Sequence, residues 1–376
     1  MYFLGQAGNY RWHNILGQTF AVGLPGDISR LREYLSARYD SDFPHTAIYH
    51  TGRSALAAAV KAVVPKNSKV IITSLTCYAV VQAIKSAGAV PVFADANPGT
   101  LHFGGKELMQ TLKRYPDAAA VVVQNNLGHA IDITEIEKLS QRHHLKIIED
   151  LAHCAGAAYP DGRECGTVGD ATILSFGKGK SVDTIAGGAL ILRDTALAPC
   201  KQPKNRPRLS SSLRERFYPL FGAEIRGLYH FSVRKRNLGR IFTAFLLKIH
   251  FIEKSADAEL SLDRRATLWQ ARRAQKILEN LPKNRPPMRD FRLVKDREKV
   301  LKELEKQGYI FQDTWYDCPV SPERYYQKVH FPEQECPVAV RLSKQIINIP
   351  TWYSKASLKS AYDLIKRYEI REAHYD

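Results

Sequence analysis

The chain has few cysteines, and none of them stands in a C-x-x-C pair. With no such pairs, neither a disulfide framework nor a zinc site is expected. A metal site built on His143 and His144 is not expected either, because adjacent residues of a helix do not face one another. The six cysteines are scattered over the 376 residues: Cys77, Cys154, Cys165, Cys200, Cys318 and Cys336.

Long hydrophobic runs are also absent. No uncharged apolar stretch reaches the roughly 18 residues that a membrane span needs, and the first twenty residues lack the pattern of a secretory signal. The composition, 44% hydrophobic and 25% charged, is that of a soluble globular protein. We therefore expect a cytoplasmic protein, and the length suits two domains.

Acidic residues are scarce in one segment. Residues 201–248 hold twelve Lys or Arg against Glu215 and Glu224, so 12 − 2 = +10 of the net charge of +17 falls here. Such an excess of positive charge can bind an acidic lipid surface or a phosphate-bearing substrate. A basic insertion that is simply exposed to solvent explains it equally well. Since no motif specific to nucleic acids accompanies it, no nucleic acid partner is expected.

Strands and helices alternate through the first half of the chain, which predicts a mostly parallel sheet with helices on both faces. Ligands bind at the carboxyl ends of such strands, which favours Thr51, Thr73, Asp150 and Ser175 as neighbours of a ligand. The expected strands are Ala47–Thr51, Val70–Thr73, Pro91–Ala94, Ala119–Gln124, Leu145–Asp150, Ala171–Ser175 and Ala189–Leu192. The expected helices are Ser54–Val63, Ala79–Ser86 and Ile133–His143.

The pattern changes after Pro199, where a basic, Pro- and Ser-rich linker predicts a domain edge near residue 200. The following stretch is aromatic, aliphatic and basic, and most apolar at 241–252. It predicts an amphipathic helix that either packs on the main domain or a partner subunit, which we favour, or lies on a membrane surface. Further helices are expected at 264–281, 296–307 and 355–367. The predicted division is a large domain over 1–200 with an N-terminal arm over about 1–25, a basic insertion or linker over 201–258, and a small domain over 259–376.

Residues 147–190 carry the strongest chemical signal. Asp150 ends an apolar strand, and Glu149 should point to the opposite face because side chains alternate along a strand. Lys180 follows Ser175 by five residues in a loop broken by glycines, with Lys178 as the alternative. A carboxylate beside a ring nitrogen and an amine that holds an aldehyde as an imine are what pyridoxal 5'-phosphate requires.

A cradle for the phosphate of this cofactor is predicted in the HTGRSAL segment after the first strand. Gly52 frees the backbone, and Arg53 and Ser54 offer amides at the start of a helix, where anions bind. Arg53 can also pair with the dianion, and Ser175 adds a hydroxyl. Ordinary helix capping explains the same residues when they are taken alone.

These elements, in this order, resemble the fold-type I pyridoxal phosphate enzymes and, among them, the DegT/DnrJ/StrS nucleotide-sugar aminotransferases. The motifs that carry the resemblance are Gly52 to Leu56, Glu149-Asp150-x-Ala152-His153, and Ser175-Phe176 followed by Lys180 and by Gly187-Gly188. It extends over about residues 30–195. It implies an α/β fold with a large, mostly parallel domain and a smaller C-terminal α/β domain.

The resemblance also implies roles for individual residues. Lys180 would hold the cofactor and shuttle a proton, Asp150 would pair with the ring nitrogen, and His153 would lie beside the ring. Phosphate would be bound by Gly52, Arg53, Ser54 and Ser175. Without the family, His153 is better explained as a core histidine.

Three positions depart from the family pattern. Cys77 stands where an aromatic side chain often covers the ring, so that either Tyr78 stacks there instead or nothing does. Asp263 aligns with an asparagine that reaches the phosphate site of the partner subunit, and an acid there would repel phosphate. The basic segment 201–258 has no counterpart.

The resulting expectation is a homodimeric aminotransferase that moves an amino group, from glutamate, to a nucleotide-linked keto sugar in polysaccharide or glycoconjugate biosynthesis. Two alternatives remain: a pyridoxal phosphate enzyme with a non-sugar substrate, and a non-catalytic member whose basic segment binds a membrane or another anionic partner.

Overall fold

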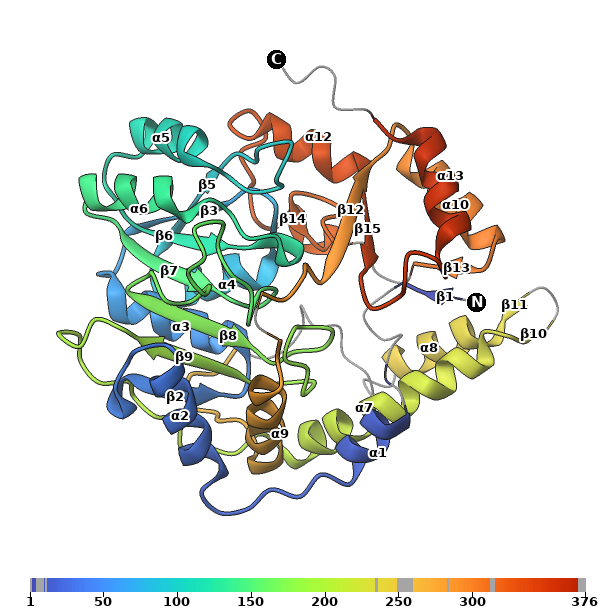
Figure 1. The fold of residues 1–376 in the computed structure, drawn as a ribbon, viewed down its shortest axis with the longest axis horizontal. Coiled ribbons are helices and arrows are strands. Elements are labelled where there is room, and N and C mark those ends of the chain that lie inside the picture. Colours follow the sequence, from blue (N-terminus) through green and yellow to red (C-terminus); the bar gives the residue numbers. More distant parts are fainter. Residues whose placement is uncertain are drawn as a thin grey trace.

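A seven-stranded sheet with helices on both faces forms the core of the larger part of the molecule, on the left in Figure 1. The computed structural model describes residues 2–4, 10, 12–233, 236–248, 260–282, 284–311 and 315–370. Only β9 runs antiparallel to its neighbours, which confirms the predicted, mostly parallel sheet. In spatial order the strands are β2 (Thr46–Tyr49), β9 (Gly188–Leu192), β8 (Ala171–Ser175), β7 (Lys146–Asp150), β6 (Ala118–Gln124), β3 (Lys69–Thr73) and β5 (Val90–Ala94).

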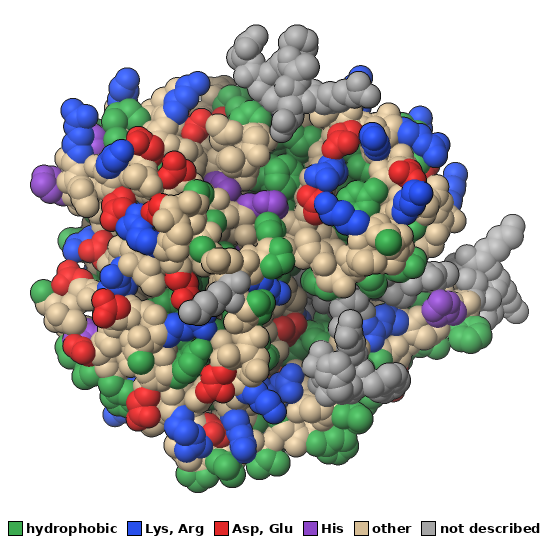
Figure 2. Space-filling view, in the orientation of Figure 1, with side chains coloured by type: hydrophobic (Ala, Val, Ile, Leu, Met, Phe, Trp, Pro, Cys, Tyr) green, Lys and Arg blue, Asp and Glu red, His purple; other side chains and the backbone are tan. Residues whose placement is uncertain are grey.

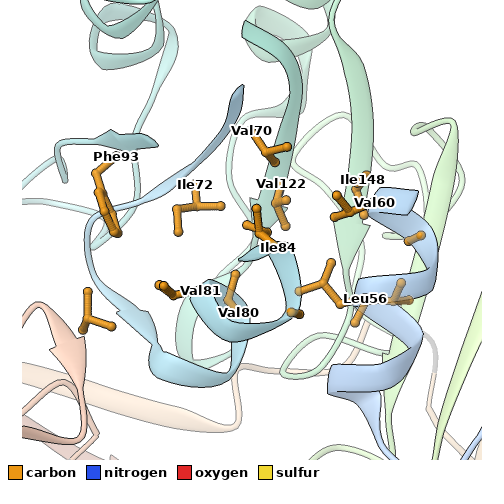
Figure 3. Close-up of a cluster of buried hydrophobic side chains, with 14 of the residues drawn as sticks. Leu56, Val60, Val70, Ile72, Val80, Val81, Ile84, Phe93, Val122 and Ile148 are labelled. Atoms are coloured by element: carbon orange, nitrogen blue, oxygen red, sulfur yellow. The ribbon is translucent and has the colours of Figure 1, made fainter. Parts of the chain in front are cut away.

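The sheet is buried on both faces because its strands are apolar at successive positions. On one face, Val70, Ile72, Val122 and Ile148 pack against α3 (Gly52–Val63) and α4 (Tyr78–Ser86), as Figure 3 shows. The alternate residues of the same strands face the other helices, which are α2 (Asp27–Arg38), α5 (Gly105–Arg114), α6 (Ile133–Arg142) and α9 (Leu268–Glu279). These two apolar layers hold the carboxyl ends of the strands in place.

A smaller α/β unit follows in the last third of the chain and has its own core. Strand β12 (Arg289–Leu293) pairs antiparallel with β15 (Ile346–Pro350), and β13 (Tyr309–Ile310) pairs with the N-terminal β1 (Tyr2–Phe3). The first residues of the chain therefore lie on this C-terminal unit. Its helices are α10 (Arg297–Lys306), α11 (Glu323–Tyr326), α12 (Pro337–Gln345) and α13 (Lys359–Tyr368), and β14 (Val320–Ser321) reaches back to β4 (Thr76–Cys77).

The basic segment folds into a helical hairpin. Helix α7 (Leu209–Leu228) packs against α1 (Trp12–Thr19) and α8 (Leu238–Lys248), with β10 (Ser232–Val233) and β11 (Arg236–Asn237) at the turn. The expected linker is helical from Leu209 onward. Within the described residues, no helix is both long and apolar enough to cross a membrane.

The structure differs from the expected domain division at α9. This helix packs against α2 and contributes Ala271, Ala274 and Leu278 to the core of the large sheet, whereas a boundary at residue 259 would place it in the small domain. The sequence predicts a helix at this position, but a helical pattern does not say against which sheet its apolar face packs.

Candidate functional site

A cavity of about 370 Å³ opens at the carboxyl ends of the parallel strands. Thr51, Asp150 and Ser175, three of the strand-end residues singled out from the sequence, line it. The fourth, Thr73, is fully buried and is not among the lining residues. The cavity thus lies where open α/β sheets bind their ligands.

Lys180 and His153 meet in this cavity. The Lys180 Nζ lies 2.7 Å from the His153 Nε2, and the Leu127 amide donates to the His153 Nδ1 at 3.2 Å. Because Nδ1 accepts a hydrogen bond, the ring proton is on Nε2. The Nε2–H group then donates a hydrogen bond to the Lys180 Nζ, and this requires an unprotonated amine. Leu127 adopts a φ of 57°, a costly conformation for leucine, and this turn aims its amide at the imidazole.

Burial shifts the pKa of both groups in the same direction. It lowers the pKa of Lys180, against the opposing effect of the nearby Cys77 and Asp150. It also lowers the pKa of His153 well below its usual value, reinforced by Lys180 and Arg289. Both shifts favour the neutral pair that the hydrogen bonds require.

The two carboxylates at the end of β7 point to opposite faces of the sheet, as predicted. Asp150 faces the cavity, where its Oδ1 accepts the Ala152 amide at 2.9 Å and burial raises its pKa. Glu149 is fully buried on the other side and accepts hydrogen bonds from the Tyr159 hydroxyl and from three amides of the β7–β8 loop. Only Asp150 is available to a ligand.

The start of α3 lies against the end of β8. Thr51 caps the helix, since its Oγ1 accepts the Ser54 amide at 3.1 Å. A Cβ at Gly52 would lie 2.5 Å from the Ser175 Cβ, so that only glycine allows the first helical amides and the Ser175 hydroxyl to share one wall of the cavity. Arg53 lines the same wall and donates to Gln82 at 2.6 Å.

Two of the predicted residues, Ser54 and Tyr78, do not line the cavity. Both the amide and the hydroxyl of Ser54 face Thr51, and Ser54 does not line the cavity. Cys77 lines the cavity, but the ring of Tyr78 stacks on Tyr325 at 4.3 Å, which corrects the expectation that Tyr78 could cover a cofactor. The alternative lysine, Lys178, lines the cavity with its Nζ 4.0 Å from the centre of the Tyr218 ring.

Asp263 is exposed and is not a lining residue, whereas its neighbour Arg264 is. The backbone of this segment pairs with the chain at Asn205. The structure thus places an arginine, not the acid, at the cavity.

Four further polar residues that line the cavity were not singled out from the sequence. Gln124 ends β6 and Asn125 and Asn126 follow it, so the rule for strand carboxyl ends would have found them. Tyr316 comes from the small unit and donates to the Asn126 Oδ1 at 2.8 Å, a contact with no sequence signal. Trp315, next to it, stacks on the His153 ring with 4.6 Å between centroids.

Helix α7 forms the opposite wall of the cavity. Glu215 fixes this helix to the large sheet, because its carboxylate lies 3.0 Å from the His50 Nε2 and accepts from the Gln270 Nε2 at 2.9 Å. The α7 wall carries further polar and basic side chains that face the strand ends: Arg208, Ser211, Arg214 and Tyr218. The basic segment is therefore part of the site, which the sequence raised only as one use of its charge.

Among the described residues, no group of three or more His, Cys, Asp or Glu side chains is placed to hold a metal ion. The arrangement instead offers a neutral amine, a buried carboxylate and a helix N-terminus around one cavity.

In sequence, the similarity to known proteins lies mainly in the first half of the chain. The sequence model of the DegT/DnrJ/EryC1/StrS aminotransferase family matches residues 36–203, which confirms the resemblance inferred from the motifs. GDP-perosamine synthase of Caulobacter vibrioides is 30% identical over 183 residues, 48% of each chain. The spore coat polysaccharide biosynthesis protein SpsC of Bacillus subtilis is 34% identical over 155 residues, 41% of this chain and 39% of that protein. The matched segment thus spans half or less of these relatives.

The fold is similar over nearly the whole chain. The crystal structure of a DegT DnrJ EryC1 StrS aminotransferase from Brucella abortus superposes with a TM-score of 0.63 at 17% identity, covering 94% of this chain and 92% of that one.

Proposed function

Since the sequence model of the DegT/DnrJ/EryC1/StrS aminotransferase family matches residues 36–203, we propose that this chain is a pyridoxal phosphate-dependent aminotransferase. Its acceptor would be a keto sugar carried on a nucleotide and its donor glutamate, in a homodimeric enzyme of polysaccharide or glycoconjugate biosynthesis. The observation that supports this best is the pair formed by the Lys180 amine and the Asp150 carboxylate, which face one cavity inside the matched segment. The similarity to GDP-perosamine synthase supports the sugar substrate.

The residues present fit the cofactor. Gly52 leaves the start of α3 in contact with Ser175, which suits a phosphate, and the hydrogen bond from His153 requires a neutral Lys180, which suits an aldehyde. Asp150 suits a protonated ring nitrogen. Bound pyridoxal phosphate supplies an aldehyde that takes up amines and a ring that accepts the electron pair of a cleaved C–H bond.

Each of these residues then has a definite task. The Lys180 Nζ takes and returns the substrate proton, which it does best with a pKa lowered toward neutrality. Asp150 stays ionised once a cation lies beside it, because the attraction offsets the burial that raises its pKa. His153 holds the Lys180 amine in place through its Nε2.

The α7 wall would orient the second substrate. Arg208, Arg214 and Arg264 line the cavity and could bind the diphosphate of a sugar nucleotide. Tyr218 and Ser211 lie on the same wall and could donate hydrogen bonds to sugar hydroxyls.

The proposal is tested with purified protein and added cofactor. Glutamate should shift the absorbance band of the bound cofactor and release 2-oxoglutarate, and a panel of nucleotide-linked keto sugars should restore the original band. If glutamate shifts the band but no sugar of the panel restores it, the aminotransferase proposal would still hold and the proposal of a nucleotide-linked sugar substrate would be overturned. No shift with any amino donor would overturn both.

A further inference from the structure

Exposed hydrophobic side chains gather on one side of the molecule. Twelve large hydrophobic residues are exposed in the described part of the chain, and nine of them fall within residues 16–24 and 209–245. Such clustering marks an interaction surface, whereas single exposed apolar residues need no explanation. The nine are Leu16, Phe20, Val22, Leu24, Leu209, Leu213, Phe231, Ile241 and Phe245.

The helices that carry these residues form one layer. Helix α1 packs on α7 and α7 packs on α8, along the lower right of the view in Figure 1. Figure 2 shows hydrophobic side chains along the lower edge of the same view, among basic and acidic ones. The exposed apolar residues therefore lie on neighbouring elements.

Helix α8 shows the pattern most clearly. Its inner side chains Phe242 and Leu246 pack with Ile225, Tyr229 and Ile310, which anchors the helix to α7 and to the small unit.

The outer face of α8, by which we mean Ile241, Ala244, Phe245 and Lys248, is exposed. These positions are spaced i, i+3, i+4 and i+7, so they form one stripe along the helix. Ile241 and Phe245 expose 48% and 53% of their surface. On the inner side of the same helix, by contrast, the apolar side chain of Leu246 is buried.

The segment that carries this face is basic. Lys201, Lys204, Arg206, Arg208 and Lys248 are exposed in the same segment, and Arg240 is exposed and pairs with Glu305. Of the two acids of the segment, Glu215 is committed to His50 and Gln270, which leaves Glu224 at the surface. An apolar helix stripe that ends in Lys248 and belongs to a basic segment suits a surface that is anionic and has an apolar interior.

A second copy of the chain is the weaker occupant. A two-fold contact brings a patch against itself, so the exposed cations of one copy would meet those of the other, which is unfavourable. The sequence match to the family model ends at residue 203, just before α7. We propose that the outer face of α8, with the exposed residues of α1 and α7 beside it, docks the protein on an anionic lipid surface.

The test is co-sedimentation of the full chain with vesicles of phosphatidylcholine alone and of phosphatidylcholine mixed with phosphatidylglycerol. The wild-type protein should sediment with the anionic vesicles, and salt should weaken the binding because it screens charge. The double variant I241S/F245S should bind at least about tenfold more weakly, since both side chains lose their burial in the lipid. Lys248→Glu should weaken binding to the anionic vesicles roughly tenfold.

Val90→Ser is the matched control, because Val90 is a similarly exposed apolar residue outside this layer, and it should bind like the wild type. Circular dichroism and thermal unfolding check that each variant is folded. Equal binding of wild type and I241S/F245S would overturn the proposal, as would absence of binding to both kinds of vesicle. Sedimentation velocity supplies the competing outcome: if I241S/F245S dissociates a dimer and the wild type ignores vesicles, the face belongs to a second copy. None of these readouts depends on transamination.

Discussion

Two lysines two residues apart in one glycine-rich loop have different surroundings. The Lys180 Nζ contacts His153, on the side of Asp150, whereas Lys178 lies over the Tyr218 ring on the α7 side. Sequence spacing favoured Lys180 and kept Lys178 as the alternative. The structure supplies a physical reason for the preference, because His153 beside Lys180 requires a neutral amine.

Lys180→Ala should abolish covalent labelling when the cofactor-loaded protein is treated with borohydride, and it should lower kcat at least about a thousandfold. Lys178→Ala is the matched control and should keep the label. Peptide mapping locates the label, and its recovery on Lys178 in the wild-type protein would contradict the assignment.

Stability should depend on pH through Lys180 in the cofactor-free protein. Burial lowers its pKa below the ordinary value near 10.5, so between the two values the unfolded chain binds a proton that the folded chain does not. The free energy of unfolding therefore rises with pH across this window and falls as pH drops toward the lowered value. Urea unfolding at a series of pH values should show a flatter dependence for Lys180→Met, and parallel curves for the two proteins would refute the shift.

Strand β7 illustrates how one element serves structure on one face and chemistry on the other. The Glu149 carboxylate organises the loop that leads from β7 to β8, through hydrogen bonds from Tyr159 and from the amides of Gly166, Val168 and Gly169. The alternation of side chains along the strand then leaves Asp150 for the cavity.

Glu149→Ala should lower the free energy of unfolding by about 3–5 kcal/mol, because it leaves several buried donors without an acceptor. Denaturant unfolding measures the change. Glu135→Ala removes an exposed carboxylate paired with Lys138 and should cost no more than about 0.5 kcal/mol. A similar small loss for Glu149→Ala would show that the loop does not depend on this carboxylate.

The whole molecule is held together by segments distant in sequence. Strand β1 pairs with β13, and the side chain of Leu4, fully buried, belongs to the core of the small unit. The α7–α8 hairpin contacts the large sheet through Glu215 and the small unit through Ile310. Of these two connections, the hairpin also lines the cavity, through α7.

Leu4→Ala should therefore destabilise the protein by about 2–4 kcal/mol although it lies four residues from the N-terminus. The exposed Leu24 provides the comparison, and Leu24→Ala should change stability by no more than about 0.5 kcal/mol. Thermal or urea unfolding distinguishes the two, and equal effects would mean that β1 does not contribute to the core of the small unit.

Local patterns were sufficient for the central sheet and for the residues that follow its strands. Apolar strands and helical periods are properties of short segments, and the carboxyl ends of parallel strands meet at one edge, so Asp150, Ser175, Lys180 and the start of α3 could be brought together from sequence. The tertiary structure alone decided that α9 belongs to the large sheet, that Tyr78 packs away from the cavity on Tyr325, and that α7 closes the cavity with arginines. These outcomes depend on which surfaces bury one another across long stretches of chain, and periodicity shows only that an apolar face exists, not what it meets.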